Sequence, residues 1–180
     1  NFGVDVSQRA PRLVDKLIIL PILGFTSLGI YQFNFQILIA IEIIPLALHS
    51  FLLSEESSGK QHKKITYLII LFSLITALLV LFISPFFINQ FFPQYSEGIT
   101  SLQIMIFSIV PLSITSILYA KLQSKDSIKV GYSVLVRIGS LLILLGLLGS
   151  IFGLNGLAVA VLASTTLNTI FLAILMRLKK

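Results

Sequence analysis

Cysteine is absent from this chain and charged residues are scarce, and each shortage narrows the possible classes of protein. Without cysteine, the chain has no disulfide framework and no thiolate metal site. The two histidines, His49 and His62, do not form a metal-ligand spacing, so we predict no metal and no cofactor. Charged residues make up 11% of the chain and hydrophobic residues 56%, whereas soluble globular domains carry roughly 25% charge. The composition therefore predicts an integral membrane protein.

Motifs for catalysis and nucleotide binding are also missing. The sequence contains no Gly-rich phosphate loop, no HExxH, no G-x-S-x-G elbow and no clustered carboxylate pair, so we predict that the protein is not an enzyme. In a soluble protein the net charge of +6 would suggest a nucleic-acid partner. Here most cations lie at the ends of apolar segments, which is a signal of membrane topology, and we predict no nucleic-acid partner.

Apolar segments of membrane-spanning length follow one another along the whole chain. A spanning helix needs ~20 mostly apolar residues, and short polar or turn-forming stretches separate segments of about that length. The predicted fold is all-α, a single polytopic membrane helical bundle without a soluble domain. About six transmembrane helices are expected, at residues 1–23, 30–53, 65–91, 99–120, 130–152 and 156–176. The predicted breaks are residues 24–29, 54–64, 93–98, 121–129 and 153–156.

Lysine and arginine are unevenly divided between the two sides of this predicted bundle. If the segments cross in alternation, the 54–64 loop, the 121–129 loop and the C-terminal tail share one side and hold nine of the 13 cationic residues, while the opposite loops hold none. By the positive-inside rule, the cation-rich side is cytoplasmic. We therefore predict a multi-pass protein of the cytoplasmic membrane with a cytoplasmic C-terminus. The other four cations fall inside predicted helices: Arg9, Arg12, Lys16 and Arg137.

The first predicted helix carries a charged face. At ~100° per residue, Asp5, Arg9, Arg12 and Lys16 lie within about 60° of one another, with Asp15 on the flank. If this helix ends at residue 23, these charges lie at midplane to inner-half depth, where each costs at least ~2.5 to 3.5 kcal/mol. Such a face is expected to line a cavity or a helix interface. Because two acids cannot neutralise three cations, it would suit an anionic ligand. In an alternative interpretation, residues 1–16 form a cytoplasmic amphipathic helix with solvated charges.

Glu42 lies about halfway along the second predicted helix, on a face shared with Tyr31. It could pair with Arg9 or Arg12 across the cavity and couple the movement of a cation or proton. It could equally be a protonated carboxyl group hydrogen-bonded between helices. In the last helix, a stripe of small and polar residues is expected to allow close helix packing: Gly156, Ala160, Ser164 and Asn168.

Four stretches, in this order and spacing, resemble one family of transporters over nearly all 180 residues. The chain is similar to the C-terminal half of polysaccharide or O-antigen flippases of the multidrug/oligosaccharidyl-lipid/polysaccharide exporter superfamily. The stretches are VDKLIILPILGFTSLGIYQFNFQ (Val14 to Gln36), FFPQYSEGITSLQIMIF (Phe91 to Phe107), ILYAKLQSKDSIKV (Ile117 to Val130) and FGLNGLAVAVLAS (Phe152 to Ser164).

This resemblance implies that the chain is one lobe of a two-lobed transporter and that the partner lobe lies upstream in the same protein. The start at Asn1 fits that expectation. The substrate would be a lipid-linked anionic glycan, a polyprenyl-diphosphate-linked oligosaccharide moved from the cytoplasmic to the outer leaflet of the lipid bilayer by alternating access. Asp15 and Lys16 match the family motif directly, whereas Arg9 and Arg12 are selected by their depth.

The site expected from both lines of reasoning has two parts. Arg9, Arg12, Asp15 and Lys16 are the candidate substrate-binding residues, with the acids orienting the cations, and Asp5 and Glu42 are candidate coupling or cavity residues. Two other functions are considered. One is a cation-coupled multidrug exporter of the same superfamily, for which a more acidic and aromatic cavity is expected. The other is a non-transporting structural membrane subunit whose polar helix faces only bind neighbouring helices.

Overall fold

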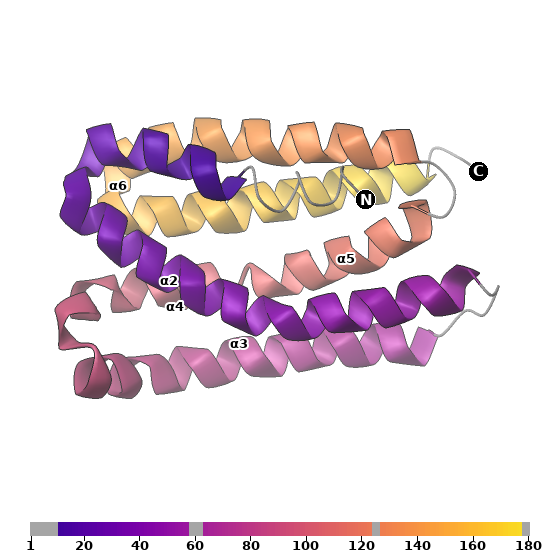
Figure 1. Ribbon diagram of the computed structural model, residues 1–180, viewed down its shortest axis with the longest axis horizontal. Helices are drawn as coiled ribbons and strands as arrows, with labels where there is room; N and C mark the ends of the chain where they lie inside the picture. Colours follow the sequence, from indigo (N-terminus) through magenta and orange to yellow (C-terminus); the bar gives the residue numbers. More distant parts are fainter. Residues whose placement is uncertain (1–10, 58–62, 124–126, 178–180) are drawn as a thin grey trace.

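The chain folds into a bundle of long helices (Figure 1). The computed structural model describes residues 11–57, 63–123 and 127–177, which are almost entirely helical. This confirms the all-α class, because no other regular structure occurs within those ranges. The elements are α2 (Pro11–Ser57), α3 (Lys63–Phe91), the 3-10 helix η1 (Pro93–Gly98), α4 (Ile99–Ile106), α5 (Ile109–Gln123) and α6 (Ser127–Arg177).

Two glycines reverse the chain inside the longest helices. Gly24 in α2 has φ 77° and ψ −178°, and Gly153 in α6 has φ 59° and ψ −137°. These backbone conformations are open to glycine because it lacks a Cβ atom. Each helix therefore has a first arm before its glycine and a second arm after it, and Figure 1 shows each second arm folding back from a turn at the end of the molecule opposite the last turn of α6.

The turns are shorter than the sequence predicted. Stretches 24–29 and 153–156 were expected as connections, but helix resumes directly after Gly24 and after Gly153. A single residue suffices because positive φ in one glycine redirects the whole chain. Gly156 then lies within the second arm of α6, where an added Cβ atom would collide with the carbonyl of Leu148 on the first arm. The absence of a side chain at Gly156 lets the two arms approach.

The helix predicted at residues 99–120 is divided into α4 and α5. Pro111 has no N–H group, so it cannot donate to the carbonyl of Phe107 as a helical residue would. That carbonyl instead accepts a bond from the backbone nitrogen of Val110, at 3.3 Å. The chain turns at Phe107 and Ser108 as a result. The predicted break at 93–98 is helical too, as η1.

Pro85 lies inside α3 without breaking it. Its missing N–H group leaves the carbonyl of Leu81 without the usual helical donor. The side-chain amide of Gln103, on α4, donates to that carbonyl at 3.0 Å. The proline thus creates an acceptor that ties α3 to the neighbouring helix.

Four helices are long and apolar enough to cross a membrane. This finding rests on length and composition within the described ranges and supports membrane insertion. It does not test the prediction of six crossings, because the two arms of α2 are counted as one span and so are the two arms of α6. The four candidate spans are Asp15–Ile43, Thr66–Phe91, Pro93–Tyr119 and Gly131–Arg177.

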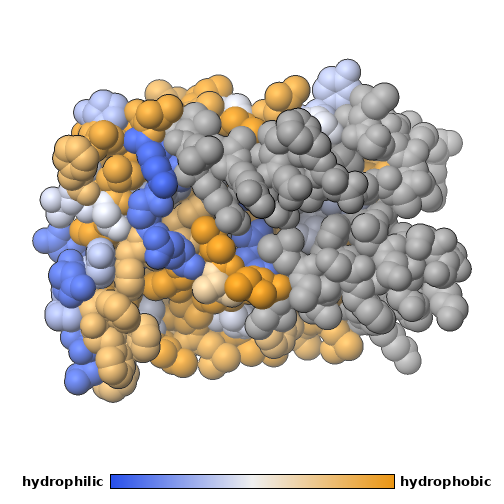
Figure 2. Space-filling view, in the orientation of Figure 1, coloured by the Kyte–Doolittle hydropathy of each residue, from blue (hydrophilic) through white to orange (hydrophobic). Residues whose placement is uncertain are grey.

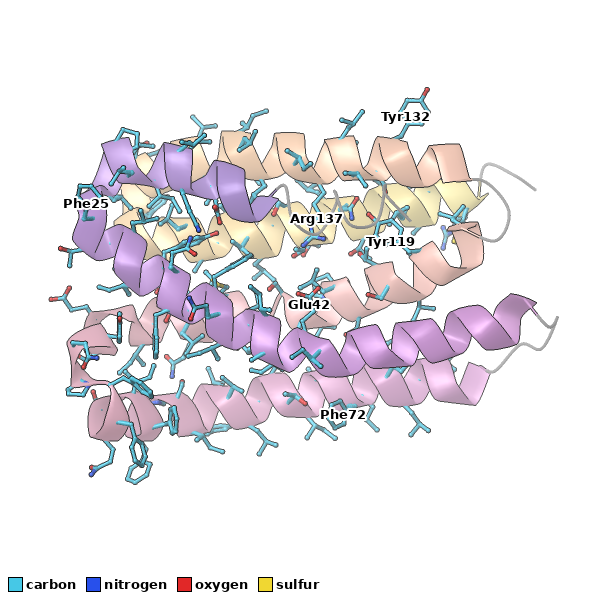
Figure 3. All side chains as sticks on the ribbon, in the orientation of Figure 1. Phe25, Glu42, Phe72, Tyr119, Tyr132 and Arg137 are labelled. Carbon is cyan, nitrogen blue, oxygen red and sulfur yellow. The ribbon has the colours of Figure 1, made fainter. Side chains whose placement is uncertain are left out.

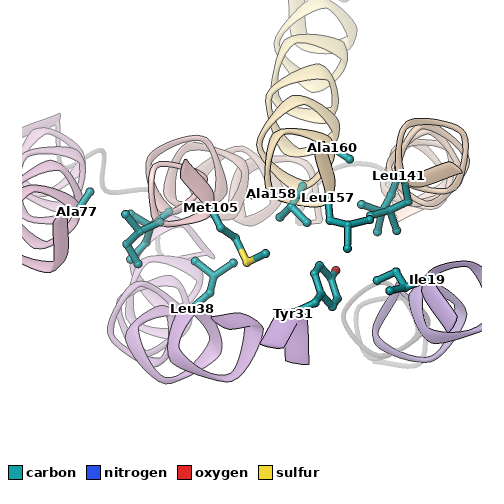
Figure 4. Close-up of a cluster of buried hydrophobic side chains, with 13 residues drawn as sticks. Ile19, Tyr31, Leu38, Ala77, Met105, Leu141, Leu157, Ala158 and Ala160 are labelled. Carbon is teal, nitrogen blue, oxygen red and sulfur yellow. The ribbon is translucent and has the colours of Figure 1, made fainter. Parts of the chain in front are cut away.

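The main core lies between α2, α4 and α6. Tyr31 lies near Ile19, Met105 and Leu157 in Figure 4, and all four side chains are buried. The outward surface of α3 remains apolar, with Phe72, Phe82 and Phe86 among its exposed side chains. Figure 2 shows the same apolar character over much of the molecular surface. A membrane protein is expected to have such a surface, because hydrocarbon rather than water surrounds it.

The predicted small-residue stripe on the second arm of α6 is confirmed as a packing surface. Gly156, Ala160, Ser164 and Asn168 are all buried. Asn168 donates to the hydroxyl of Tyr119 on α5, at 3.4 Å. This places a hydrogen bond where the small residues allow close approach.

Candidate functional site

The structure describes part of the predicted site. Asp5 and Arg9 lie outside the described residues. The backbone of Arg12 belongs to the first arm of α2, but its side chain is outside the described part. Asp15, Lys16 and Glu42 lie within it, so the geometry of the site is built from these three.

Asp15 is buried at the hairpin of α2, with 1% of its surface exposed. Its Oδ2 atom accepts a hydrogen bond from the hydroxyl of Tyr31 at 3.2 Å. Its Oδ1 atom accepts from the backbone nitrogen of Lys16 at 2.7 Å. Both carboxylate oxygens therefore have donors, which a buried carboxyl group requires. Asp15 faces the bundle interior rather than the surface.

The reversal at Gly24 explains this pair. Asp15 lies nine residues before Gly24 and Tyr31 seven residues after it, so folding the second arm back brings them to nearly the same depth. Tyr31 was predicted to share a face with Glu42, and its bond to Asp15 was missed. The sequence did contain a signal for this bond, because Asp15 and Tyr31 lie at nearly equal distances from Gly24 along the chain. That signal could be used only with the knowledge that Gly24 alone makes the turn.

Lys16 follows Asp15 directly but has the opposite environment. Its side chain is exposed, whereas that of Asp15 is buried. The two residues that match the flippase motif thus take different positions on the first arm. An exposed ammonium group is available to a ligand, and the buried carboxyl group can fix the arm that carries it.

Glu42 lies on the second arm of α2, and Arg137 on the first arm of α6 (Figure 3). Both side chains are partly buried, and Glu42 takes part in an interaction within the protein. Neither residue joins the Asp15–Tyr31 pair through a described hydrogen bond. Their predicted roles, cation coupling for Glu42 and either interfacial or cavity placement for Arg137, therefore stay predictions.

Other features of the described part limit what chemistry the bundle supports. Within those residues, no group of three or more His, Asp or Glu side chains could hold a metal ion. An apolar groove lies between α2, α3 and α4, and its lining includes Ile37, Ile83 and Leu102. The polar features near Lys16 therefore make a better candidate site for a charged ligand than this groove.

Comparison of the chain with protein-family models, with curated proteins and with solved structures finds no match in any of the three. The function is therefore inferred from the residues and their geometry.

Proposed function

We propose that this chain is one lobe of a membrane transporter that moves a polyprenyl-diphosphate-linked oligosaccharide across the cytoplasmic membrane by alternating access. The observation that carries the proposal is the pair of neighbours Asp15 and Lys16, one buried and hydrogen-bonded, the other exposed. Their sequence motif resembles that of lipid-linked oligosaccharide flippases. In this proposal, the six helical segments cross the membrane separately, and an upstream lobe of the same protein faces this one.

The position of Lys16 supports a role in binding an anion. Lys16 lies eight residues before the turn at Gly24, which is ~12 Å along the helix axis. A cation at such depth in a membrane usually faces a bundle interior or a water-filled cavity. A diphosphate would neutralise its charge there. Substrate carrying two phosphate groups would therefore be held at Lys16, with Arg9 and Arg12 as the predicted further cations.

Asp15 would act as a positioning residue in this proposal. Its bond to Tyr31 joins the two arms of α2 at the depth of the cation, and its other oxygen accepts from the backbone of Lys16 within the first arm. A buried carboxyl group with both oxygens occupied is a poor direct ligand for a phosphate, and like charge would oppose the contact. The hydrogen bonds instead hold the first arm, and with it Lys16, in register with the second arm.

Replacing Lys16 tests the proposal. In the full-length protein, Lys16→Ala is expected to lower glycan export by roughly tenfold or more, since hydrogen bonds to charged groups contribute about 1.5–3 kcal/mol. Export is measured as lipid-linked glycan appearing in the outer leaflet at normal expression. Arg177→Ala is the matched control, because Arg177 is an exposed cation at the end of α6. Equal export by both variants and the unaltered protein would rule out the anion-binding role of Lys16.

Arg9 and Arg12, whose side chains lie outside the described part of the chain, can be tested in the same way. Arg9→Ala and Arg12→Ala are each expected to abolish glycan export at normal expression, because each would remove a charge that the diphosphate needs. Membrane levels of each variant are measured alongside export. Unaltered export in both variants would limit the site to Lys16 and contradict the cavity placement of the arginines.

A cation-coupled multidrug exporter of the same superfamily is the second candidate function. The buried carboxyl group of Asp15, inside a candidate membrane span, favours it, because intramembrane carboxyl groups commonly serve cation or proton transport. Efflux of organic cations from cells distinguishes the two. Drug efflux that depends on Asp15, together with unchanged glycan export, would favour this second function.

A further inference from the structure

Two glutamine side chains lie on the second arm of α2, next to the proposed anion site. Gln32 and Gln36 are four residues apart, so they share one face of the helix. Gln36 is exposed, and Gln32 is partly buried. The side-chain nitrogen of Gln32 is fully enclosed and has no hydrogen-bond partner. This face therefore presents the exposed amide of Gln36, whereas the nitrogen of Gln32 is enclosed and out of reach of an occupant.

The bond between Asp15 and Tyr31 places these amides on the same side of the hairpin as Lys16. The arms run in opposite directions, and each next residue is rotated by ~100° around its own helix. Asp15 and Tyr31 face each other across the two antiparallel arms. Because each arm is right-handed and they run in opposite directions, the residue after Asp15 (Lys16) and the residue after Tyr31 (Gln32) are rotated toward the same side of the hairpin. Because Asp15 and Tyr31 point into the core, that side is the outer face of the hairpin.

The outer face of the hairpin is more hydrophilic than the rest of the molecular surface, which is largely apolar. Figure 2 shows hydrophilic residues gathered over the arms of α2 on the face turned to the viewer. The span that contains them has a mean hydropathy of 1.5, the lowest of the four, against 2.7 for the span of α3. Amides exposed to hydrocarbon without a partner cost several kcal/mol each. The outer face of the hairpin is thus suited to a polar occupant and poorly suited to lipid tails.

We propose that Lys16 and Gln36 form one polar track that binds the head group of the transported lipid, with Lys16 on a phosphate and the amide of Gln36 on sugar hydroxyl groups. This inference rests on the proposed transport function and adds the part of the substrate that each residue contacts. Amides suit hydroxyl groups because they both donate and accept hydrogen bonds.

The polar track has one occupant in this proposal, a glycosyl diphosphate. The positive charge of Lys16 matches a phosphate, and the amide of Gln36 carries no charge. An acidic group at the position of this amide would gain no ion pair there. The first sugar attached to the diphosphate is therefore expected to present hydroxyl or amide groups to the track rather than a carboxylate.

Labelling with thiol reagents tests whether the residues of the track are accessible to water. The chain has no cysteine of its own, so Lys16→Cys and Gln36→Cys are studied singly in the full-length protein with any cysteine outside this segment replaced. A charged, membrane-impermeant maleimide is expected to label both positions. Leu78→Cys is the control, because Leu78 is an exposed side chain on α3, the candidate span with the highest mean hydropathy. Labelling of Gln36→Cys as slow as that of Leu78→Cys would overturn the inference.

Protection by two probes separates the contacts along the track. A polyprenyl diphosphate without sugar is expected to slow labelling at least tenfold at position 16 and to leave position 36 unchanged. The same lipid bearing a disaccharide is expected to protect both positions. Equal protection of position 36 by the two probes would overturn the assignment of the Gln36 amide to the sugar. Labelling at both positions without protection by either probe would overturn the binding track itself.

A substitution that keeps the size of the side chain gives an independent measurement. Gln36→Leu is expected to weaken binding of the disaccharide-bearing lipid by about tenfold, equivalent to about 1.4 kcal/mol, and to leave binding of the bare diphosphate lipid unchanged. Gln90→Leu is the matched control, an exposed amide on α3. Binding and labelling are measured without transport. A track that binds as expected in a protein that exports no glycan would therefore contradict the proposed function and leave this inference intact.

Discussion

Tyr31 contributes both to the core and to the proposed site. Its ring lies in the main hydrophobic cluster, while its hydroxyl donates to Asp15. A tyrosine at this place satisfies a carboxyl group that the fold has removed from water, and its ring fills apolar space. The hydroxyl is thus the donor from the second arm that satisfies the buried carboxyl group of Asp15 on the first arm.

Removing that hydroxyl should destabilise the bundle. Tyr31→Phe leaves Oδ2 of Asp15 without its described donor, and leaving a buried acceptor unsatisfied costs about 1–3 kcal/mol. We expect a lower midpoint of thermal unfolding, measured by circular dichroism in detergent. Tyr132→Phe is the control, because Tyr132 points away from the bundle and is exposed (Figure 3). A midpoint for Tyr31→Phe equal to that of the control would show that the hydrogen bond adds no stability.

At the scale of the element, the helical hairpins of α2 and α6 depend on single glycines. Gly24 and Gly153 are the two residues with positive φ among those described. In each helix, the arms on either side of the glycine bring together residues that are distant along the chain. In α2 this reversal creates the pairing of Asp15 with Tyr31, and therefore the register of the proposed binding track.

Replacing Gly24 should disturb the α2 hairpin for conformational reasons alone. An added Cβ atom at Gly24 would meet nothing within 4 Å, so Gly24→Ala creates no collision. Its backbone conformation is nevertheless almost restricted to glycine, and such strain costs of order 1–3 kcal/mol. We expect Gly24→Ala to lower the thermal midpoint in detergent.

Gly29→Ala provides the matched comparison. Gly29 also has open space around it, but it lies in the helix without positive φ, where alanine is favoured by up to about 1 kcal/mol. This variant should be as stable as the unaltered protein or more stable. A larger loss of stability for Gly29→Ala than for Gly24→Ala would contradict the one-residue turn.

At the scale of the whole molecule, the turns at Gly24 and Gly153 and the 3-10 helix η1 lie at one end of the bundle, and the last turn of α6 lies at the other (Figure 1). Six separate crossings would place that first end outside the cell and the C-terminus in the cytoplasm. The distribution of lysine and arginine predicts the same orientation. The arrangement of the helices is compatible with this topology, which stays a prediction.

Labelling of intact cells tests the six crossings. Thr26→Cys, Glu97→Cys and Asn155→Cys change exposed residues at the end with the turns, and an impermeant thiol reagent should label all three from outside. Arg177→Cys, at the opposite end, should react only after the membrane is made permeable. Failure of the first and third variants to react from outside, with labelling of the second, would support fewer crossings and contradict the six-helix prediction.

The sequence by itself determined the class of the protein and the approximate position of most helices. Its apolar segments are long enough to span a membrane, and glycines mark the two reversals. The sequence also identified Asp15 and Lys16, because a charge within an apolar segment stands out. Local composition carries these signals, so no knowledge of distant contacts is needed to detect them.

Tertiary structure alone decided which side of the hairpin each residue occupies. The burial of Asp15, the exposure of Lys16 and the bond between Asp15 and Tyr31 depend on how the second arm of α2 folds back over the first. Neighbours in sequence diverge by ~100° around a helix, and residues on opposite arms meet only after the turn. The carbonyl of Pro111 on α5 likewise accepts a hydrogen bond from the hydroxyl of Thr169 on α6, at 3.0 Å, and only the tertiary fold brings these two residues together.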